Sequence, residues 1–235
     1  MKTLSHNNHI QGLRAFAIIP VIFFHADPEI FYSGYLGVDI FFVISGYLIC
    51  RAISKNKMNW KNITDFYKKR ASRTLPALFF IIFATIPIFF LILPPTNLLN
   101  YGQSLIATTF FLSNFLFGIE NTYWGPISEL KPLLHTWSLS IEWQLYILFP
   151  LLFFFDRKKI IVIILLLVSF VISALVDFND VIFYIKNQKI RIDHYFFSLN
   201  RVWEFLAGSA LAISELNKKN KETDTFAHIY AGLGF

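Results

Sequence analysis

Long apolar runs separated by short polar stretches dominate the chain. The apolar segments cover residues 13–24, 35–50, 75–93, 102–118, 136–155, 160–176 and 195–214. The longest runs without a charge, 75–93 and 160–176, approach the roughly 20 residues that a helix needs to cross a bilayer. The segments lack the strict alternation of a membrane β-strand. Because lipid offers no partners to backbone N–H and C=O groups, the pattern predicts an all-α fold, a polytopic transmembrane helical bundle.

Composition supports lipid as the solvent of this chain. Apolar residues fill 55% of the 235 positions, and Phe alone occurs 28 times, which is too apolar for one soluble core. The net charge is +6, but the basic residues lie between the apolar segments and form no basic, aromatic surface suited to nucleic acid. The single cysteine, Cys50, cannot form an intrachain disulfide and has no metal-ligand spacing around it, so no metal site is predicted.

Basic residues predict the orientation of the segments. Residues 51–73 contain eight Lys or Arg and one acid: Arg51, Lys55, Lys57, Lys61, Lys68, Lys69, Arg70 and Arg73 against Asp65. The positive-inside rule places this connecting loop in the cytoplasm, together with residues 157–159 and 218–221. The N-terminus is then cytoplasmic, and Asp27 and Glu29 face outward. No small-x-small cleavage site follows His25, so the first segment is expected to stay in the mature protein.

The number of segments conflicts with this orientation. Between Arg73 and Arg157, both predicted to be cytoplasmic, the chain must cross the membrane an even number of times, yet three apolar segments lie there. One of two segments is therefore predicted to be re-entrant or tilted: 102–118, which carries several polar residues, or 136–155, which holds Glu142. Polar backbone at membrane depth is tolerated where it lines a cavity, so the conflict predicts a polar cavity.

Arg14 and His25 are ionisable residues within the first apolar segment. Their separation of eleven returns to nearly the same helix face, about 16 Å further along the axis. Pro20 lies between them and can kink the helix toward that face. Two interpretations stay open. Both residues line a functional site, or the Arg14 side chain extends to the cytoplasmic membrane–water interface while His25 caps the outer end of the helix.

Three further residues at membrane depth need partners. Asp39 requires a cation or several donors; Arg14 or His25 is the nearest cation in sequence, and a structural ion pair is favoured. Arg201 and Glu204 are three residues apart on one helix face and are predicted to pair with each other.

Residues 135–142 and the basic run before residue 75 carry candidate chemistry. His135, Ser138 and Glu142 share one helix face, which gathers groups suited to acid–base chemistry. Hydrogen bonding is favoured for Ser138, and for Glu142 both catalysis and helix packing stay open. Arg70 and Arg73 suit bidentate phosphate contact, although a membrane anchor also explains the charge of this run.

The order of these motifs is specific. Along the chain stand the Arg14–His25 pair, GVDIFFVISGYLI at 37–49, the basic run before LPAL at 75–78, HTWSLSIE at 135–142 and RVWEFLAG at 201–208. This order resembles the acyltransferase-3 family of bacterial membrane O-acyltransferases, especially the members that acetylate lipopolysaccharide O-antigen or peptidoglycan. By resemblance, Arg14 and His25 correspond to the family's Arg-x10-His motif, and Arg70 and Arg73 to its loop arginines. Two positions depart from the pattern: Trp143 stands where a second Glu is common, and Ser72 where an additional Arg is common.

The resemblance implies an enzyme of the bacterial inner membrane. The donor would be acyl-CoA, most often acetyl-CoA, and the acceptor a hydroxyl of a surface glycan such as O-antigen or peptidoglycan; neither nucleic acid nor metal is expected. Arg14, Arg70 and Arg73 would bind the CoA phosphates. His25 would act as general base or carry the acyl group, and Asp39 or Glu142 would orient its ring.

Family members have further membrane helices and in many cases an SGNH-type domain, so residues 1–235 are interpreted as an incomplete acyltransferase-3 domain. Two alternatives stay open. In a transporter or flippase, the same charges would form a midplane site without covalent chemistry. In a truncated, non-catalytic remnant of the enzyme, the motifs would survive without activity.

Overall fold

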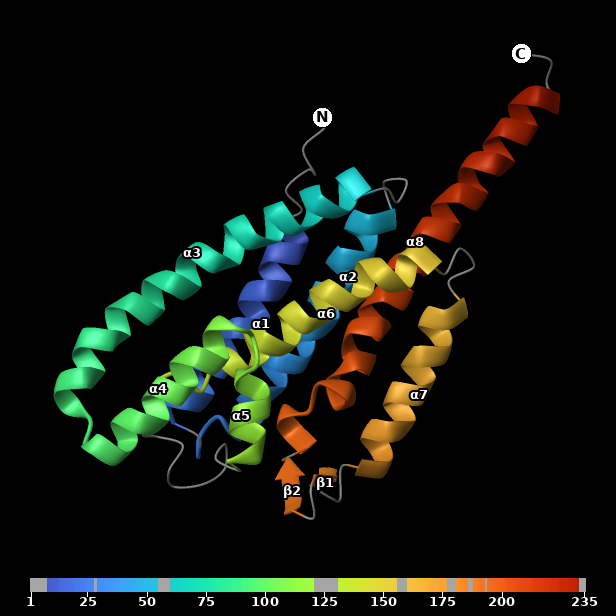
Figure 1. The fold of residues 1–235 in the computed structure, drawn as a ribbon. Coiled ribbons are helices and arrows are strands. Elements are labelled where there is room, and N and C mark those ends of the chain that lie inside the picture. Colours follow the sequence, from blue (N-terminus) through green and yellow to red (C-terminus); the bar gives the residue numbers. More distant parts are fainter. Residues whose placement is uncertain are drawn as a thin grey trace.

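The computed structural model describes residues 8–27, 29–54, 60–120, 131–155, 160–176, 181–185, 188–192 and 194–232. Its helices are α1 (Asn8–Ala26), α2 (Leu36–Ser54), α3 (Trp60–Ile92), α4 (Pro95–Thr109), α5 (Ser113–Ile119), α6 (Thr136–Phe155), α7 (Ile160–Val176) and α8 (Ser198–Gly232). Figure 1 shows them as one helical bundle, which confirms the predicted fold class.

Short elements complete the fold. Two 3-10 turns, η1 (Tyr32–Tyr35) and η3 (His194–Phe196), precede α2 and α8. An antiparallel hairpin of β1 (Val181–Ile185) and β2 (Gln188–Ile192) pairs Val181 with Ile192 and Ile185 with Gln188. This hairpin was not predicted from the sequence.

Helices long and apolar enough to cross a membrane occur in the first part of the chain. Three such spans lie among the described residues: His9–Ala26, Tyr32–Ser54 and Lys61–Ile92. Large apolar side chains stand on the surface of these helices, with Phe16 68% exposed, Phe80 73% and Leu91 84%. Such exposure is costly in water and is expected where a helix faces lipid.

Each helix end lies at one of the two ends of the bundle (Figure 1). The start of α1, the end of α2 and the start of α3 lie at the same end of the bundle as the end of α6 and the start of α7. The end of α1, the end of α3 and the β1–β2 hairpin lie at the other end. This arrangement matches the alternation expected from the basic residues. It differs in one detail, because the predicted loop 51–73 is largely helical: α2 continues to Ser54 and α3 begins at Trp60.

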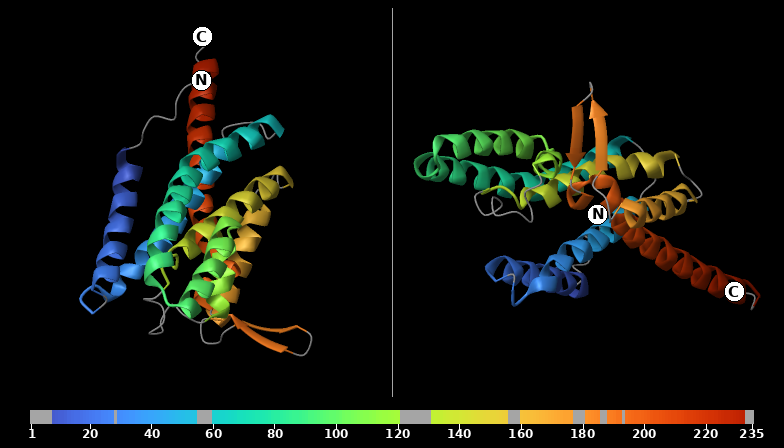
Figure 2. Two further views of the ribbon diagram at one scale, coloured as in Figure 1. Left: turned by 60° about the vertical axis from the view of Figure 1, so that its left-hand side comes forward. Right: turned by 90° about the horizontal axis from the view of Figure 1, so that it is seen from below.

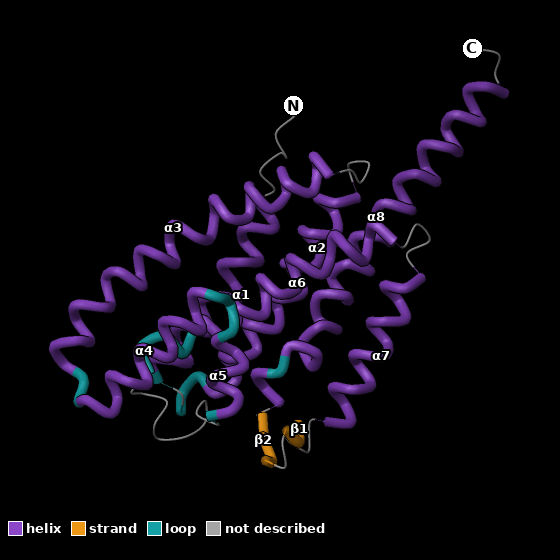
Figure 3. The backbone as a smooth tube through the Cα atoms, in the orientation of Figure 1, coloured by secondary structure: helices purple, strands orange, loops and turns teal. Residues whose placement is uncertain are grey.

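The segment 102–118 is not one helix. The chain turns at Phe110–Leu112 between α4 and α5, where Phe111 has a φ of 56°. Figure 1 shows α4 starting, and α5 ending, at the end of the bundle where α3 ends, and Figure 3 shows the break between them as a loop. The prediction that one of the segments 102–118 and 136–155 does not cross as a straight helix is confirmed, and the interrupted segment is the first of the two.

Glycines bring α2 and α8 into close contact (Figure 2). A Cβ atom on Gly46 would come within 2.0 Å of the Phe205 carbonyl oxygen, and one on Gly208 within 1.9 Å of the Val43 carbonyl oxygen. Any larger side chain would force the helices apart. Small residues at both sides of the crossing therefore set its spacing.

Candidate functional site

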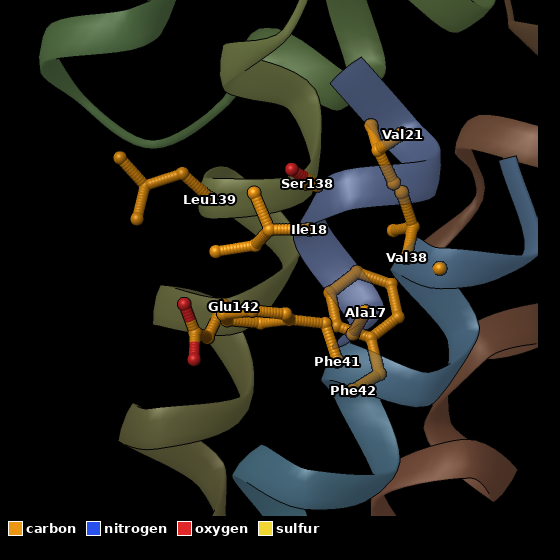
Figure 4. Close-up of a pocket in the computed structure, with 10 residues that line it drawn as sticks. Ala17, Ile18, Val21, Val38, Phe41, Phe42, Ser138, Leu139 and Glu142 are labelled. Carbon is orange, nitrogen blue, oxygen red and sulfur yellow. The ribbon is translucent and has the colours of Figure 1, made fainter. Parts of the chain in front are cut away.

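A cavity of about 240 Å³ lies between α1, α2 and α6 (Figure 4). Its lining residues are Ala17, Ile18, Val21, Gly37, Val38, Phe41, Phe42, Ser138, Leu139 and Glu142. Most of these side chains are apolar, and Glu142 is the one ionisable group among them. The cavity therefore combines an apolar interior with a single carboxyl group.

Along α1, Arg14 precedes and His25 follows the three residues of this helix that line the cavity. Between them, Ala17, Ile18 and Val21 line the cavity, and these residues follow the helical spacing that places side chains on one face. Close packing presents this face to α2, because a Cβ atom on Gly37 would approach the Ala17 carbonyl oxygen to 2.1 Å.

The His25 ring is fixed by the backbone of its own helix. Its Nδ1 lies 2.7 Å from the Val21 carbonyl oxygen. A carbonyl oxygen can only accept, so Nδ1 donates, and Nε2 of the neutral ring keeps its lone pair. The exposed Nε2 edge is therefore free to act as a base or nucleophile. The resemblance implied that Asp39 or Glu142 orients this ring, whereas the observed partner is the Val21 carbonyl.

His135 packs against His25. The two ring centroids are 4.4 Å apart, and the ring planes are nearly perpendicular at 86°. His135 directly precedes α6, so the contact joins the end of α1 to the start of α6. Partial burial and the neighbouring His25 lower the pKa of the His135 imidazole, which favours its neutral form.

Glu142 belongs to a hydrogen-bonded group on the opposite wall. Its Oε1 accepts a hydrogen bond from Ser45 Oγ at 2.6 Å and another from the Tyr146 hydroxyl. The Arg70 guanidinium lies over the Tyr146 ring, 4.8 Å from its centroid. Arg70, from the basic run on α3, is thereby connected through Tyr146 to the carboxyl group of the cavity.

Asp39 pairs with α8 and not with α1. Arg201 donates to Asp39 Oδ1 and to Glu204 Oε1, each at 2.7 Å. The predicted pair of Arg201 with Glu204 is therefore present, but the expectation that Arg14 or His25 neutralises Asp39 is wrong. The close crossing of α2 and α8 accounts for the difference, because it brings Arg201 nearer to Asp39 than sequence order suggests.

The arginines predicted to bind phosphate differ in their surroundings. The Arg14 guanidinium lies 5.3 Å from the centroid of the Phe41 ring, and its buried Nε atom has no hydrogen-bond partner in the structure. Arg73 is exposed on α3. The structure thus connects Arg14 and Arg70 to the cavity walls and leaves Arg73 at the surface.

The two positions that depart from the family pattern, Trp143 and Ser72, have different surroundings. Trp143 is buried: it stacks on Phe111 at 4.8 Å and donates from Nε1 to Thr74 Oγ1 at 3.1 Å. Position 143 thus faces α3 and the α4–α5 turn and is not among the cavity lining. Ser72 is exposed and bonds the Lys69 carbonyl of its own helix.

The fold defines a multi-pass helical membrane protein, with a cavity between three of its helices that holds one carboxyl group. Residues 7–234 match the family model of an acyltransferase domain, and the chain belongs to this family, acyltransferase-3.

Relatives agree with this assignment. The O-acetyltransferase OatA of Staphylococcus aureus strain NCTC 8325 / PS 47 is 35% identical over 206 residues, which cover 86% of this chain and 34% of OatA. A protein of S. aureus strain MSSA476, named as a candidate O-acetyltransferase, is 33% identical over 153 residues, which cover 64% of this chain and 25% of that protein. The chain thus spans about a third or less of the length of these relatives. No solved structure matches it significantly.

Proposed function

We propose that this chain forms the acyl-transfer site of a membrane O-acyltransferase. It transfers an acyl group, in particular acetyl, from acyl-CoA to a hydroxyl of a cell-surface glycan such as O-antigen or peptidoglycan. The protein lies in the bacterial inner membrane with its N-terminus in the cytoplasm. The observation that carries the proposal is the face of α1 that lines an apolar cavity with Ala17, Ile18 and Val21. Arg14 and His25 continue this face on either side by helical spacing.

The donor fits the cytoplasmic side of this cavity. The partnerless Nε atom of Arg14 offers a buried N–H to an anion, and the planar guanidinium can hold two phosphate oxygens at once. Arg70 and Arg73 add positive charge on α3 for the same CoA phosphates. The apolar lining between α1 and α2 accepts the acyl group, which has little affinity for water.

His25 supplies the reactive nitrogen. With Nδ1 bonded to Val21, Nε2 can take the proton of the acceptor hydroxyl as its oxygen attacks the thioester carbonyl. The C–S bond then breaks, and the proton passes to the departing thiolate, which leaves as the CoA thiol. Alternatively, Nε2 attacks the carbonyl itself and carries the acyl group.

The two carboxylates have separate roles in this proposal. Glu142, held by Ser45 and Tyr146, places negative charge in the cavity and stabilises the positive charge that His25 gains during transfer. Asp39 acts as a positioning residue, because its pair with Arg201 fixes α2, which forms the second wall of the cavity.

Two substitutions test the proposal. His25→Ala removes the reactive nitrogen, and Arg14→Lys keeps the charge but loses the planar fork. Both should lower acyl-CoA consumption by about 100-fold or more when activity is normalised to the amount of protein in the membrane. The matched controls are His9→Ala for the histidine variant and Arg51→Lys for the arginine variant, because each makes the same change away from the cavity. Near-normal specific activity in both test variants would contradict the proposed site, and glycan-dependent transport without CoA release would favour the flippase.

A further inference from the structure

We propose that His135 is a second catalytic residue, the general base that accepts the proton of the acceptor hydroxyl while His25 carries the acyl group. This inference rests on the proposed function and gives a specific step to His135, which the sequence placed on a face with Ser138 and Glu142 without a defined role. It starts from the contact between the two imidazole rings, whose centroids are 4.4 Å apart.

His135 lies one residue before α6, and its spacing continues the face of α6 that lines the cavity. Ser138, Leu139 and Glu142 follow it at the spacing of one helix face, and all three are lining residues. On α1, His25 follows Ala17, Ile18 and Val21 in the same way. The two lining faces therefore meet at the histidine pair, which stands at one end of the cavity.

The hydrogen bond of His25 explains why a second base is needed. Nδ1 is occupied by the Val21 carbonyl, so Nε2 is the one nitrogen of this ring that can react. While Nε2 carries the acyl group, it cannot also take the proton of the incoming hydroxyl. Another base must lie within reach of the acylated ring.

His135 meets this need. Within the described part of the chain, neither of its ring nitrogens is engaged in a hydrogen bond, and its ring lies against that of His25. Desolvation by its neighbours and the charge of His25 lower the pKa of the His135 imidazole, which favours the neutral ring, the form that can accept a proton. Ser138 cannot substitute for it, because its hydroxyl donates to the His135 carbonyl at 3.3 Å and is itself a poor base.

The proposed sequence has two steps. First, His25 Nε2 attacks the thioester carbonyl, the C–S bond breaks, and the CoA thiolate departs, leaving an acyl-imidazolium. Second, the acceptor oxygen attacks the acyl carbon, its proton passes to His135, and the C–N bond breaks to release the ester and neutral His25. His135 then loses its proton to solvent. The CoA thiolate takes up one proton from solvent, so the number of protons is unchanged over the cycle.

The same contact between the two rings would be seen if His135 only packed against His25. The substitution His135→Phe distinguishes this packing role from the catalytic role. Phe keeps an aromatic ring against His25 but removes both nitrogens. His9→Phe, at the exposed start of α1, is the matched control. The measurement is a single turnover of acetyl-CoA, radiolabelled in the acetyl group, in membranes that carry the full protein. CoA thiol, protein-bound label and glycan-bound label are quantified after rapid quenching.

The predicted result is that His135→Phe releases about one CoA per enzyme and retains label on the protein, while glycan labelling falls by about 100-fold or more. Product at the parent rate would overturn the proposal, because the ring alone would then suffice. Loss of the CoA burst together with the product would also overturn it, because the first step does not require His135. Normal product formation by His25→Phe would instead refute the proposed function itself.

Discussion

Arg201 on α8 donates a hydrogen bond to Asp39 on α2 at 2.7 Å, and the two residues join helices that are distant in the sequence. The Arg201 side chain is 12% exposed, and the same nitrogen also bonds Glu204, whose side chain is 2% exposed. Two carboxylates thus share one guanidinium in a poorly solvated position, and the Glu204 Oε2 atom has no partner in the structure. The positive charge of Arg201 is therefore central to the α2–α8 contact.

Replacing Arg201 with Met should destabilise the fold strongly. Removal of one partner from a buried ion pair costs about 3–5 kcal/mol, and here two carboxylates would lose their cation. Thermal unfolding in detergent measures the effect, with Arg73→Met at the exposed surface of α3 as the control. Adding Asp39→Asn and Glu204→Gln should restore much of the stability, and no recovery in this triple variant would show that charge is not the cause.

The two glycines at the α2–α8 crossing should not tolerate alanine. Gly46→Ala or Gly208→Ala places a methyl group about 2 Å from a backbone oxygen of the facing helix, so the helices must separate and lose packing. Gly102→Ala on α4 is the matched control: nothing lies within 4 Å of the added atom, and alanine favours a helix by about 0.5–1 kcal/mol. Equal melting temperatures for all three variants would argue against the observed crossing.

Gln144 should hold the turn between α4 and α5. Its Nε2 donates to the Phe111 carbonyl and to Asn114 Oδ1, each at 2.8 Å, and its Oε1 accepts from Ser198 Oγ. Gln144→Leu leaves these polar groups without partners, at a cost of about 1–3 kcal/mol for each buried group. Faster proteolysis between α4 and α5 in the variant would demonstrate the effect. A cleavage rate equal to that of the parent would show that the turn is held by other contacts.

The helices and the interrupted segment were predictable because their signals are local. Long apolar runs indicate contact with lipid, and basic clusters indicate the stretches that stay outside it. The odd number of apolar segments between Arg73 and Arg157 then required one irregular element. The face shared by Arg14 and His25 followed from helical periodicity alone.

Contacts between helices were not predictable in the same way. The sequence suggested α1 as the source of the cation for Asp39, because neighbours in sequence are the default partners, yet Arg201 of α8 is the partner. The approach of His135 to His25 likewise depends on how α6 crosses α1. The sequence spacing of His135, Ser138 and Glu142 placed His135 on a face with other polar groups. It did not indicate that His25 would be the residue opposite.

The orientation in the membrane should follow the basic residues. Lys61→Cys, on an exposed position at the start of α3, should react with a membrane-impermeant thiol reagent only after cells are opened. Glu29→Cys, exposed after α1, should react in intact cells. The natural Cys50 is buried and serves as the background. Reaction of the Lys61→Cys protein in intact cells would reverse the topology.

The most direct test of the proposed function is the mass of the acceptor glycan. Membranes from cells that carry the protein are supplied with isotope-labelled acetyl-CoA, and the surface glycan is then isolated and analysed by mass spectrometry. We predict labelled O-acetyl esters with the parent protein and with His9→Ala, and none above background with His25→Ala at equal membrane levels. Absence of label with the parent, or equal labelling with His25→Ala, would contradict acyl transfer through the cavity between α1, α2 and α6.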